Sequence, residues 1–178
     1  MGTYVDRLQV DIGVADASTP APQMIELPSL LGFPAPRLAG YPPETVVAEK
    51  FHAMVVLGIP NSRMKDFYDL WVSCRDLSFD GPRLCRAIQA TFRRRQTAIP
   101  AQTPVALSEE FATDPAKRTQ WEAFLCKTGV QDRVALPEVV PVLHDFLMPP
   151  TAAVSNGEPL DVVWQDGRHW EAVGEGRP

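Results

Sequence analysis

The sequence predicts an α+β protein in which a small strand-bearing front precedes a helical body. Residues 4–14 alternate apolar and polar side chains, which is the period of a strand with one buried face. Beyond residue 43, apolar residues recur three and four positions apart, as they do on the core-facing side of helices. The length of 178 residues suits one ordinary domain or a domain with an appendage.

The front of the chain, residues 1–40, is expected to hold one to three strands of a sheet. Residues 24–31 are mostly apolar but contain Pro28, which favours an edge strand or a bridging segment because proline cannot donate to a strand ladder. Residues 37–39 are expected to form a further short strand.

The remaining residues are expected to form a helical bundle over residues 41–150, followed by a loose C-terminal tail over residues 151–178. Pro43 suits the first turn of a helix that ends at Gly58. The tail contains a strand-like stretch near residues 160–170. The expected helices span residues 43–58, 66–75, 80–96, 114–127 and 137–148.

Composition limits the classes of partner. The net charge of −5 provides no global basic field, so a nucleic-acid contact would need a local patch. No apolar run approaches the ~20 residues of a membrane span, and the start lacks the apolar region of a signal peptide. The three cysteines show no disulfide or zinc pattern. We therefore expect a cytoplasmic protein with no membrane partner.

The longest apolar run carries two adjacent charged residues, Glu49 and Lys50. On a helical wheel, Lys50 falls between Met54 and Leu57, and the helix is apolar nearly all round, which predicts a buried helix. A lysine there is costly unless its ammonium group reaches an anion or water. Two interpretations stay open: a structural ion pair or snorkelling lysine, and a cation presented to phosphate or acidic groups in a pocket.

The helix that follows begins with Asp66, and Asp69 lies one turn later on the same side. Asp66 has the sequence position of an N-cap, which is its structural interpretation. Asp69 is a candidate partner for Lys50 or for a ligand. Arg63 and Lys65 add cations between the helices, so the helical hairpin has the composition of a corner that binds phosphate.

The segments AEKFHAMVVLG (residues 48–58) and SRMKDFYDLW (residues 62–71) resemble the third and fourth motifs of AbiEii-type nucleotidyltransferases, toxins of the AbiE abortive-infection and toxin–antitoxin class. The segment LQVDIGVAD (residues 8–16) resembles the strand of the second motif, with Asp11 as its acidic residue. The resemblance implies a partial nucleotidyltransferase-like sheet followed by the helical bundle. It also implies transfer of a nucleotide from NTP and Mg²⁺ to an acceptor, with tRNA favoured, and a role in phage defence with a cognate antitoxin.

The same resemblance implies roles for the residues. Lys50 would contact nucleotide phosphate, Asp69 would orient Lys50 or act as base, and Glu49 would help to position the helix. Asp11 would assist the metal. The implied sites are catalytic (Lys50, Asp69, Asp66 and Glu49), nucleotide-binding (Lys50, Arg63 and Lys65) and metal-binding (Asp11).

The family's first motif, a Gly-Ser turn followed by two acidic residues, is missing, because the sequence contains no Gly-Ser dipeptide. We therefore expect the chain to be a truncated form that is inactive alone. The alternative is a non-catalytic module that binds an antitoxin or nucleic acid. The concentrated basic residues are either a solvated face or a contact for tRNA phosphates or an acidic antitoxin. These residues are Arg83, Arg86, Arg93, Arg94 and Arg95.

Overall fold

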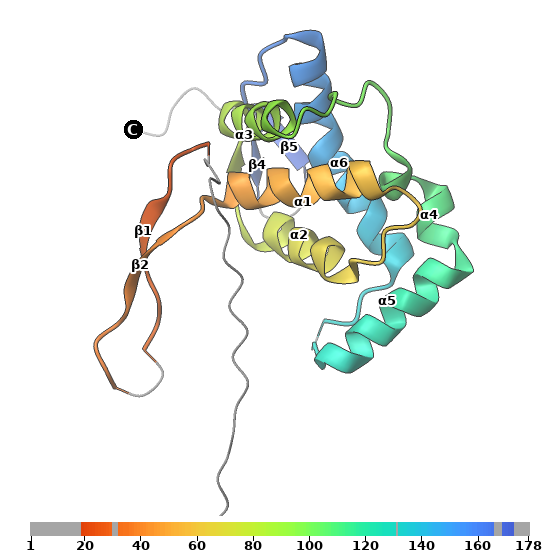
Figure 1. Ribbon diagram of the computed structural model, residues 1–178, viewed down its shortest axis with the longest axis horizontal. Helices are drawn as coiled ribbons and strands as arrows, with labels where there is room; N and C mark the ends of the chain where they lie inside the picture. Colours follow the sequence, from red (N-terminus) through yellow and green to blue (C-terminus); the bar gives the residue numbers. More distant parts are fainter. Residues whose placement is uncertain (1–18, 30–31, 131, 166–168, 173–178) are drawn as a thin grey trace, which may run out of the picture.

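The computed structural model describes residues 19–29, 32–130, 132–165 and 169–172. The strand expected at residues 4–14, together with Asp11, lies outside the described residues. Within them the α+β class is confirmed, with helices forming the body and short antiparallel strands placed before and after most of it in the sequence (Figure 1). The helices are α1 (Pro43–Leu57), α2 (Met64–Asp76), α3 (Gly81–Arg94), the 3₁₀ turn η1 (Val105–Leu107), α4 (Glu109–Thr113), α5 (Pro115–Thr128) and α6 (Leu136–Asn156). The strands are β1 (Gln23–Glu26), β2 (Arg37–Gly40), β3 (Phe79–Asp80), β4 (Val162–Gln165) and β5 (His169–Ala172).

Helix α6 forms the centre of the core. It contacts α2, α3, α4, η1 and β5, while α1 packs on α2 and α3 (Figure 1). Leu143, Phe146 and Leu147 of α6 are fully buried. The three helices that carry the charged residues of interest are therefore held together by a shared apolar core.

Aspartate side chains cap the start of α3 and α5. The carboxylate of Asp80 accepts a hydrogen bond from the Arg83 amide at 2.8 Å, and Asp114 does the same for the Lys117 amide at 2.8 Å. Helix α2 behaves differently, because it begins at Met64 and makes no side-chain cap. The N-cap interpretation of Asp66 was wrong: this residue lies inside the first turn, and its carboxylate pairs with Lys50 instead.

Helix α6 continues past the expected end at residue 148, through Pro149 and Pro150. Pro150 has no N–H to donate to the Phe146 carbonyl. Trp170 Nε1 donates to that carbonyl at 3.2 Å in its place, and Thr151 Oγ1 donates to the Leu147 carbonyl at 2.6 Å. Trp170 thus satisfies the carbonyl that Pro150 leaves free, and the bond from Thr151 adds a second donor to an ordinary helical carbonyl.

Much of the predicted loose tail is structured. Strand β4 pairs with β3 and β5 in an antiparallel sheet, with Trp164 opposite both Phe79 and Trp170. Trp164 is 1% exposed, and its indole N–H donates to the Cys74 carbonyl at 2.6 Å. A Cβ at Gly81 would lie 2.4 Å from the Leu160 carbonyl oxygen, so glycine is required where the segment before β4 passes the start of α3.

Strands β1 and β2 form an antiparallel hairpin that projects from the side of the body (Figure 1). This agrees with the edge strand expected within residues 24–31. Whether the hairpin is part of a nucleotidyltransferase sheet stays a prediction. Apolar side chains exposed on this segment are Met24, Ile25, Leu27, Phe33 and Leu38.

The expectation of a fully buried α1 was wrong in part. Phe51 and Met54 are fully buried, but Val46, Val56 and Leu57 are exposed. The packing explains the difference, because α1 contacts α2, α3 and η1 on its inner side only. Glu49 and Lys50 lie between these buried and exposed faces.

Candidate functional site

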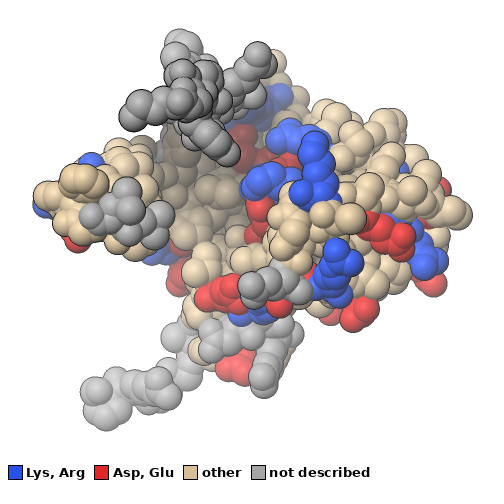
Figure 2. Space-filling model, turned by 90° about the horizontal axis from the view of Figure 1, so that it is seen from below, with Lys and Arg blue, Asp and Glu red and all other residues tan. Residues whose placement is uncertain are grey.

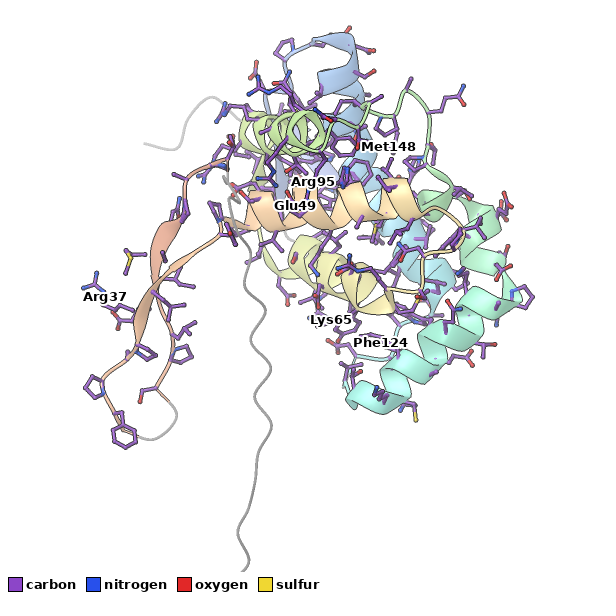
Figure 3. All side chains as sticks on the ribbon, in the orientation of Figure 1. Arg37, Glu49, Lys65, Arg95, Phe124 and Met148 are labelled. Atoms are coloured by element: carbon purple, nitrogen blue, oxygen red, sulfur yellow. The ribbon has the colours of Figure 1, made fainter. Side chains whose placement is uncertain are left out.

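Glu49 and Lys50 are adjacent on α1, and their side chains reach different neighbouring helices. Lys50 bonds to residues of α2, whereas Glu49 bonds to residues at the end of α3. Consecutive helical residues point about 100° apart, which is why one helix can engage both neighbours in this way. Figure 3 shows Glu49 beside Arg95 where α1 faces α3, with Lys65 on α2.

The Lys50 ammonium group is held by two carboxylates. Its Nζ donates to Asp66 Oδ1 at 2.7 Å and to Asp69 Oδ2 at 2.8 Å. Burial alone would lower the pKa of Lys50, but the hydrogen bonds to Asp66 and Asp69 outweigh it, so the pKa lies above its usual value of 10.5. Lys50 is therefore charged at neutral pH. An ammonium has three N–H donors, and described residues accept from two of them.

Asp66 and Asp69 each bind a second cation. Asp66 is 95% buried, and its Oδ2 lies 2.8 Å from Arg63 Nε at an approach too bent for a hydrogen bond. Asp69 Oδ2 accepts a hydrogen bond from Lys65 at 2.6 Å. Burial would raise the pKa of Asp69, but the bonds from Lys50 and Lys65 more than offset that and lower the pKa. We call Lys50, Arg63, Lys65, Asp66 and Asp69 the Lys50 cluster.

Glu49 is the centre of a second cluster with the opposite arrangement. Its Oε1 accepts from Thr91 Oγ1 at 3.1 Å and pairs with Arg94, and its Oε2 accepts from Arg95 at 3.0 Å. We call Glu49, Thr91, Arg94 and Arg95 the Glu49 cluster. This contact joins α1 to α3.

The end of α3 aims Arg95 toward α1. The Thr97 amide donates to the Phe92 carbonyl and the Gln96 amide to the Arg93 carbonyl, which is a Schellman motif. Gln96 takes the left-handed position of that motif, with φ of 53°, where glycine is usual. The chain therefore reverses sharply after Arg95. This turn places Thr97 Oγ1 within hydrogen-bonding distance of His52 Nε2, at 2.8 Å.

The two clusters line one open cleft of about 330 Å³. Its lining residues are Glu49, Lys50, His52, Ala53, Arg63, Asp66 and Arg95. The lining holds three cations (Lys50, Arg63 and Arg95) and two carboxylates (Glu49 and Asp66), so the cleft has a local excess of positive charge in a chain of net charge −5. Figure 2 shows Lys and Arg side chains gathered beside Asp and Glu near the middle of the face that it displays. The arrangement suits an anionic ligand with several oxygens.

His52 has an imidazole on the cleft wall. Burial lowers the pKa of His52, and the nearby Arg95 and Arg94 lower it further, against an opposing effect of Glu49. The ring is therefore neutral at pH 7. The hydrogen bond between His52 and Thr97 joins α1 to the segment after α3, which gives this histidine a structural role.

The basic patch expected on α3 is divided in two. Arg83 pairs with Glu44 at 3.1 Å, and Arg94 and Arg95 pair with Glu49, so these arginines contact α1. Arg86 and Arg93 are exposed, seven residues apart on one face of α3. The sequence could not divide the patch because the acidic partners lie about 40 residues away. The contact with tRNA stays a prediction.

The fit of Mg²⁺ can be tested on the carboxylates. The described ranges contain no group of three or more His, Cys, Asp or Glu side chains that could hold a metal ion. Asp66, Asp69 and Glu49 are each bound by two cations. The described residues therefore do not fit a magnesium ion, and Asp11 lies outside them.

Comparison with protein families assigns the chain to a family. Residues 1–139 match the family described as "Nucleotidyl transferase AbiEii toxin, Type IV TA system", and the chain belongs to this nucleotidyltransferase toxin family. Comparisons with curated proteins and with solved structures gave no match. Among the helices in the described ranges, none has both the length and the hydropathy needed to cross a bilayer.

Proposed function

We propose that the cleft binds the phosphates of a nucleoside triphosphate for nucleotidyl transfer to an acceptor hydroxyl, with tRNA as the favoured acceptor. The observation that carries this proposal is the Lys50 ammonium, partly buried and fixed by Asp66 and Asp69 in a cleft with surplus cations. A cation held in advance binds a phosphate oxygen without losing further side-chain entropy.

Each cation has a distinct part in this proposal. Lys50 offers its third N–H to a phosphate oxygen. Arg63 approaches Asp66 most closely through Nε, so its Nη groups are placed to bind a second oxygen. Arg95 and Lys65 are more exposed and add charge at the rim. Asp69 orients Lys50; its lowered pKa and its two cationic partners make it a poor proton acceptor.

In the proposed reaction, an acceptor hydroxyl loses its proton to solvent and its oxygen forms a bond to the α-phosphorus, while the bond from that phosphorus to pyrophosphate breaks. Pyrophosphate leaves with the negative charge, which Lys50 and Arg63 stabilise. We derive no step through Mg²⁺, because the described residues do not fit it. For the same reason we propose that this chain alone transfers little nucleotide. Its toxin–antitoxin family supports an antitoxin as its partner.

The test uses each radiolabelled NTP, with Mg²⁺ and total tRNA, on the wild type and on Lys50→Met. Lys127→Met is the matched control, because Lys127 is an exposed lysine on α5 that does not line the cleft. We expect wild type and Lys127→Met to retain NTP on a filter, Lys50→Met to lose it, and little label to reach RNA.

Two outcomes would change this proposal. Strong RNA labelling by the wild type that disappears in Lys50→Met would overturn the proposed inactivity and support the site. Equal NTP retention by the wild type and Lys50→Met would overturn the site itself.

A second function, a non-catalytic module that binds an antitoxin or nucleic acid, is favoured by one observation. The exposed apolar side chains of the β1–β2 hairpin, led by Phe33 at 70% exposure, form a surface suited to a protein partner. Recovery of a co-encoded small protein on the wild type but not on Phe33→Ser would support this function. Self-association through the hairpin in its place would count against it.

A further inference from the structure

Lys117 on α5 is buried at a position that is unfavourable for a cation. Its residue is 5% exposed, and in the described part of the chain no carboxylate pairs with its Nζ. It also lies in the first turn of α5, where the helix dipole disfavours a cation. A buried ammonium with neutral acceptors and this dipole is costly, which indicates that it has a specific task.

The contacts of Lys117 identify that task. Its Nζ donates to the Asn61 carbonyl at 2.9 Å and to Gln120 Oε1 at 3.3 Å, and lies 5.5 Å from the Phe111 ring centre. Asn61 is 1% exposed and belongs to the loop between α1 and α2. Lys117 therefore ties α5 to the loop that precedes the Lys50 cluster.

The same loop fixes the backbone of Arg63. Asn61 Oδ1 accepts from the Arg63 amide at 2.9 Å, and the Asn61 amide donates to the Gly58 carbonyl at 3.1 Å. Arg63 has φ of −82° and ψ of 63°, and the Met64 amide donates to the Ser62 carbonyl at 2.9 Å. These values describe an inverse γ-turn centred on Arg63. Arg63 then reaches the cleft, where its Nε lies 2.8 Å from Asp66.

We infer that Lys117 is a positioning residue that acts through Asn61 to hold Arg63 at the phosphate cleft. This inference deepens the proposed function and rests on it for the identity of the ligand. The placement itself rests on the contacts alone. Among the described residues, the partners of the Lys117 ammonium are Asn61, Gln120 and the Phe111 ring, and none of these lines the cleft, so its effect on a ligand should pass through Arg63.

The experiment measures tripolyphosphate binding by calorimetry in a double-mutant cycle of Lys117→Met and Arg63→Ala. Methionine keeps the apolar stem against Phe111 and removes the ammonium. We expect Lys117→Met to weaken binding by about tenfold when Arg63 is present and to have no further effect in Arg63→Ala. Lys117→Arg should retain binding, and Lys127→Met should match the wild type.

Amide hydrogen exchange provides a readout that needs no ligand. In Lys117→Met, the amides of Asn61 and Arg63 should exchange faster, while the Thr97 amide at the end of α3 should be unchanged. Asn61→Ala, which removes the acceptor of the Arg63 amide, should produce the same binding loss if Lys117→Met folds poorly.

The outcomes separate the two proposals. Exchange at wild-type rates in Lys117→Met, or an equal loss of binding with and without Arg63, would overturn the positioning role. Absence of tripolyphosphate binding by the wild type would overturn the proposed function, and hydrogen exchange would still decide the role of Lys117.

Discussion

The Lys50 cluster and the Glu49 cluster are neighbours whose central side chains carry opposite charges. In the first, a cation on α1 is held by two carboxylates of α2; in the second, a carboxylate on α1 is held by two arginines of α3. Lys50 is the less exposed of the two, at 19% of its side chain against 30% for Glu49. Asp66 beside Lys50 is almost completely buried.

This difference indicates that the Lys50 cluster is a ligand-binding site and the Glu49 cluster a structural contact between helices. Each cluster has one more cation than it has carboxylates, but only the Lys50 cluster places a rigidly held cation at the floor of the cleft. The Glu49 cluster joins α1 to α3 and places its surplus charge at the rim. We expect substitutions in the two clusters to differ in size and, for an anionic ligand, in sign.

The largest expected effect is that of Lys50→Met on stability. It leaves the buried Asp66 carboxylate facing Asp69 with Arg63 as its remaining partner, which we expect to lower the free energy of unfolding by about 2–3 kcal/mol. Urea unfolding measures the change. Adding Asp66→Asn should restore part of the loss, and a double variant no more stable than Lys50→Met would contradict the ionic origin.

Glu49→Gln should have a smaller effect. The amide retains an acceptor for Thr91 but no longer neutralises Arg94 and Arg95, and the cluster is partly exposed, so we expect a loss of about 1 kcal/mol. Urea unfolding is again the measurement. A loss of unfolding free energy equal to that of Lys50→Met would show that the two clusters are equivalent, which would contradict the distinction between a binding site and a structural contact.

His52, which lies beside the Glu49 cluster, should make the stability of the protein depend on pH. Burial and the arginines lower the pKa of His52, so below its usual value of 6.5 the unfolded chain binds more protons than the folded one. Stability should therefore fall as pH drops below 6.5, by less than the effect of Glu49→Gln. Thermal melts of the wild type and His52→Gln between pH 5 and 8 measure this, and identical slopes would contradict it.

Lys65→Met should have the smallest effect. Lys65 bonds to Asp69 at 2.6 Å, but its side chain is 72% exposed, so we expect a loss of about 0.3 kcal/mol. Chemical unfolding at 50 mM and 500 mM salt measures it. A loss as large as that of Lys50→Met would mean that the exposed rim, rather than the buried floor, holds α2.

The sequence predicted much of the helical body for physical reasons that are local. Pro43 and Gly58 mark the ends of α1, and the spacing of Leu84, Ile88 and Phe92 marks the buried face of α3. The adjacent Glu49 and Lys50 predicted two charges beside a core. Local sequence patterns are sufficient where the residues that predict an element also form it.

Of the charge pairs, the sequence offered only Asp69 as a candidate partner for Lys50, and the structure shows that bond. The pairs of Lys50 with Asp66 and of Glu49 with the arginines after it could not be predicted, because the partners lie 16 to 46 positions away. Asp66 has the sequence of an N-cap, and only the fold shows that α2 begins two residues earlier. Lys117 looks like an ordinary surface lysine until its burial against Asn61 is seen. Pro149 and Pro150 indicated a helix end because the compensating Trp170 lies 20 residues later.

The most direct test of the account is a calorimetric titration of tripolyphosphate into the wild type, Lys50→Met and Glu49→Gln at low salt, with folding checked by circular dichroism. We predict that Lys50→Met weakens binding by at least about tenfold, whereas Glu49→Gln strengthens it, because the second change adds to the surplus of positive charge. Binding that is absent in the wild type, or that weakens equally in both variants, would contradict a phosphate site centred on Lys50.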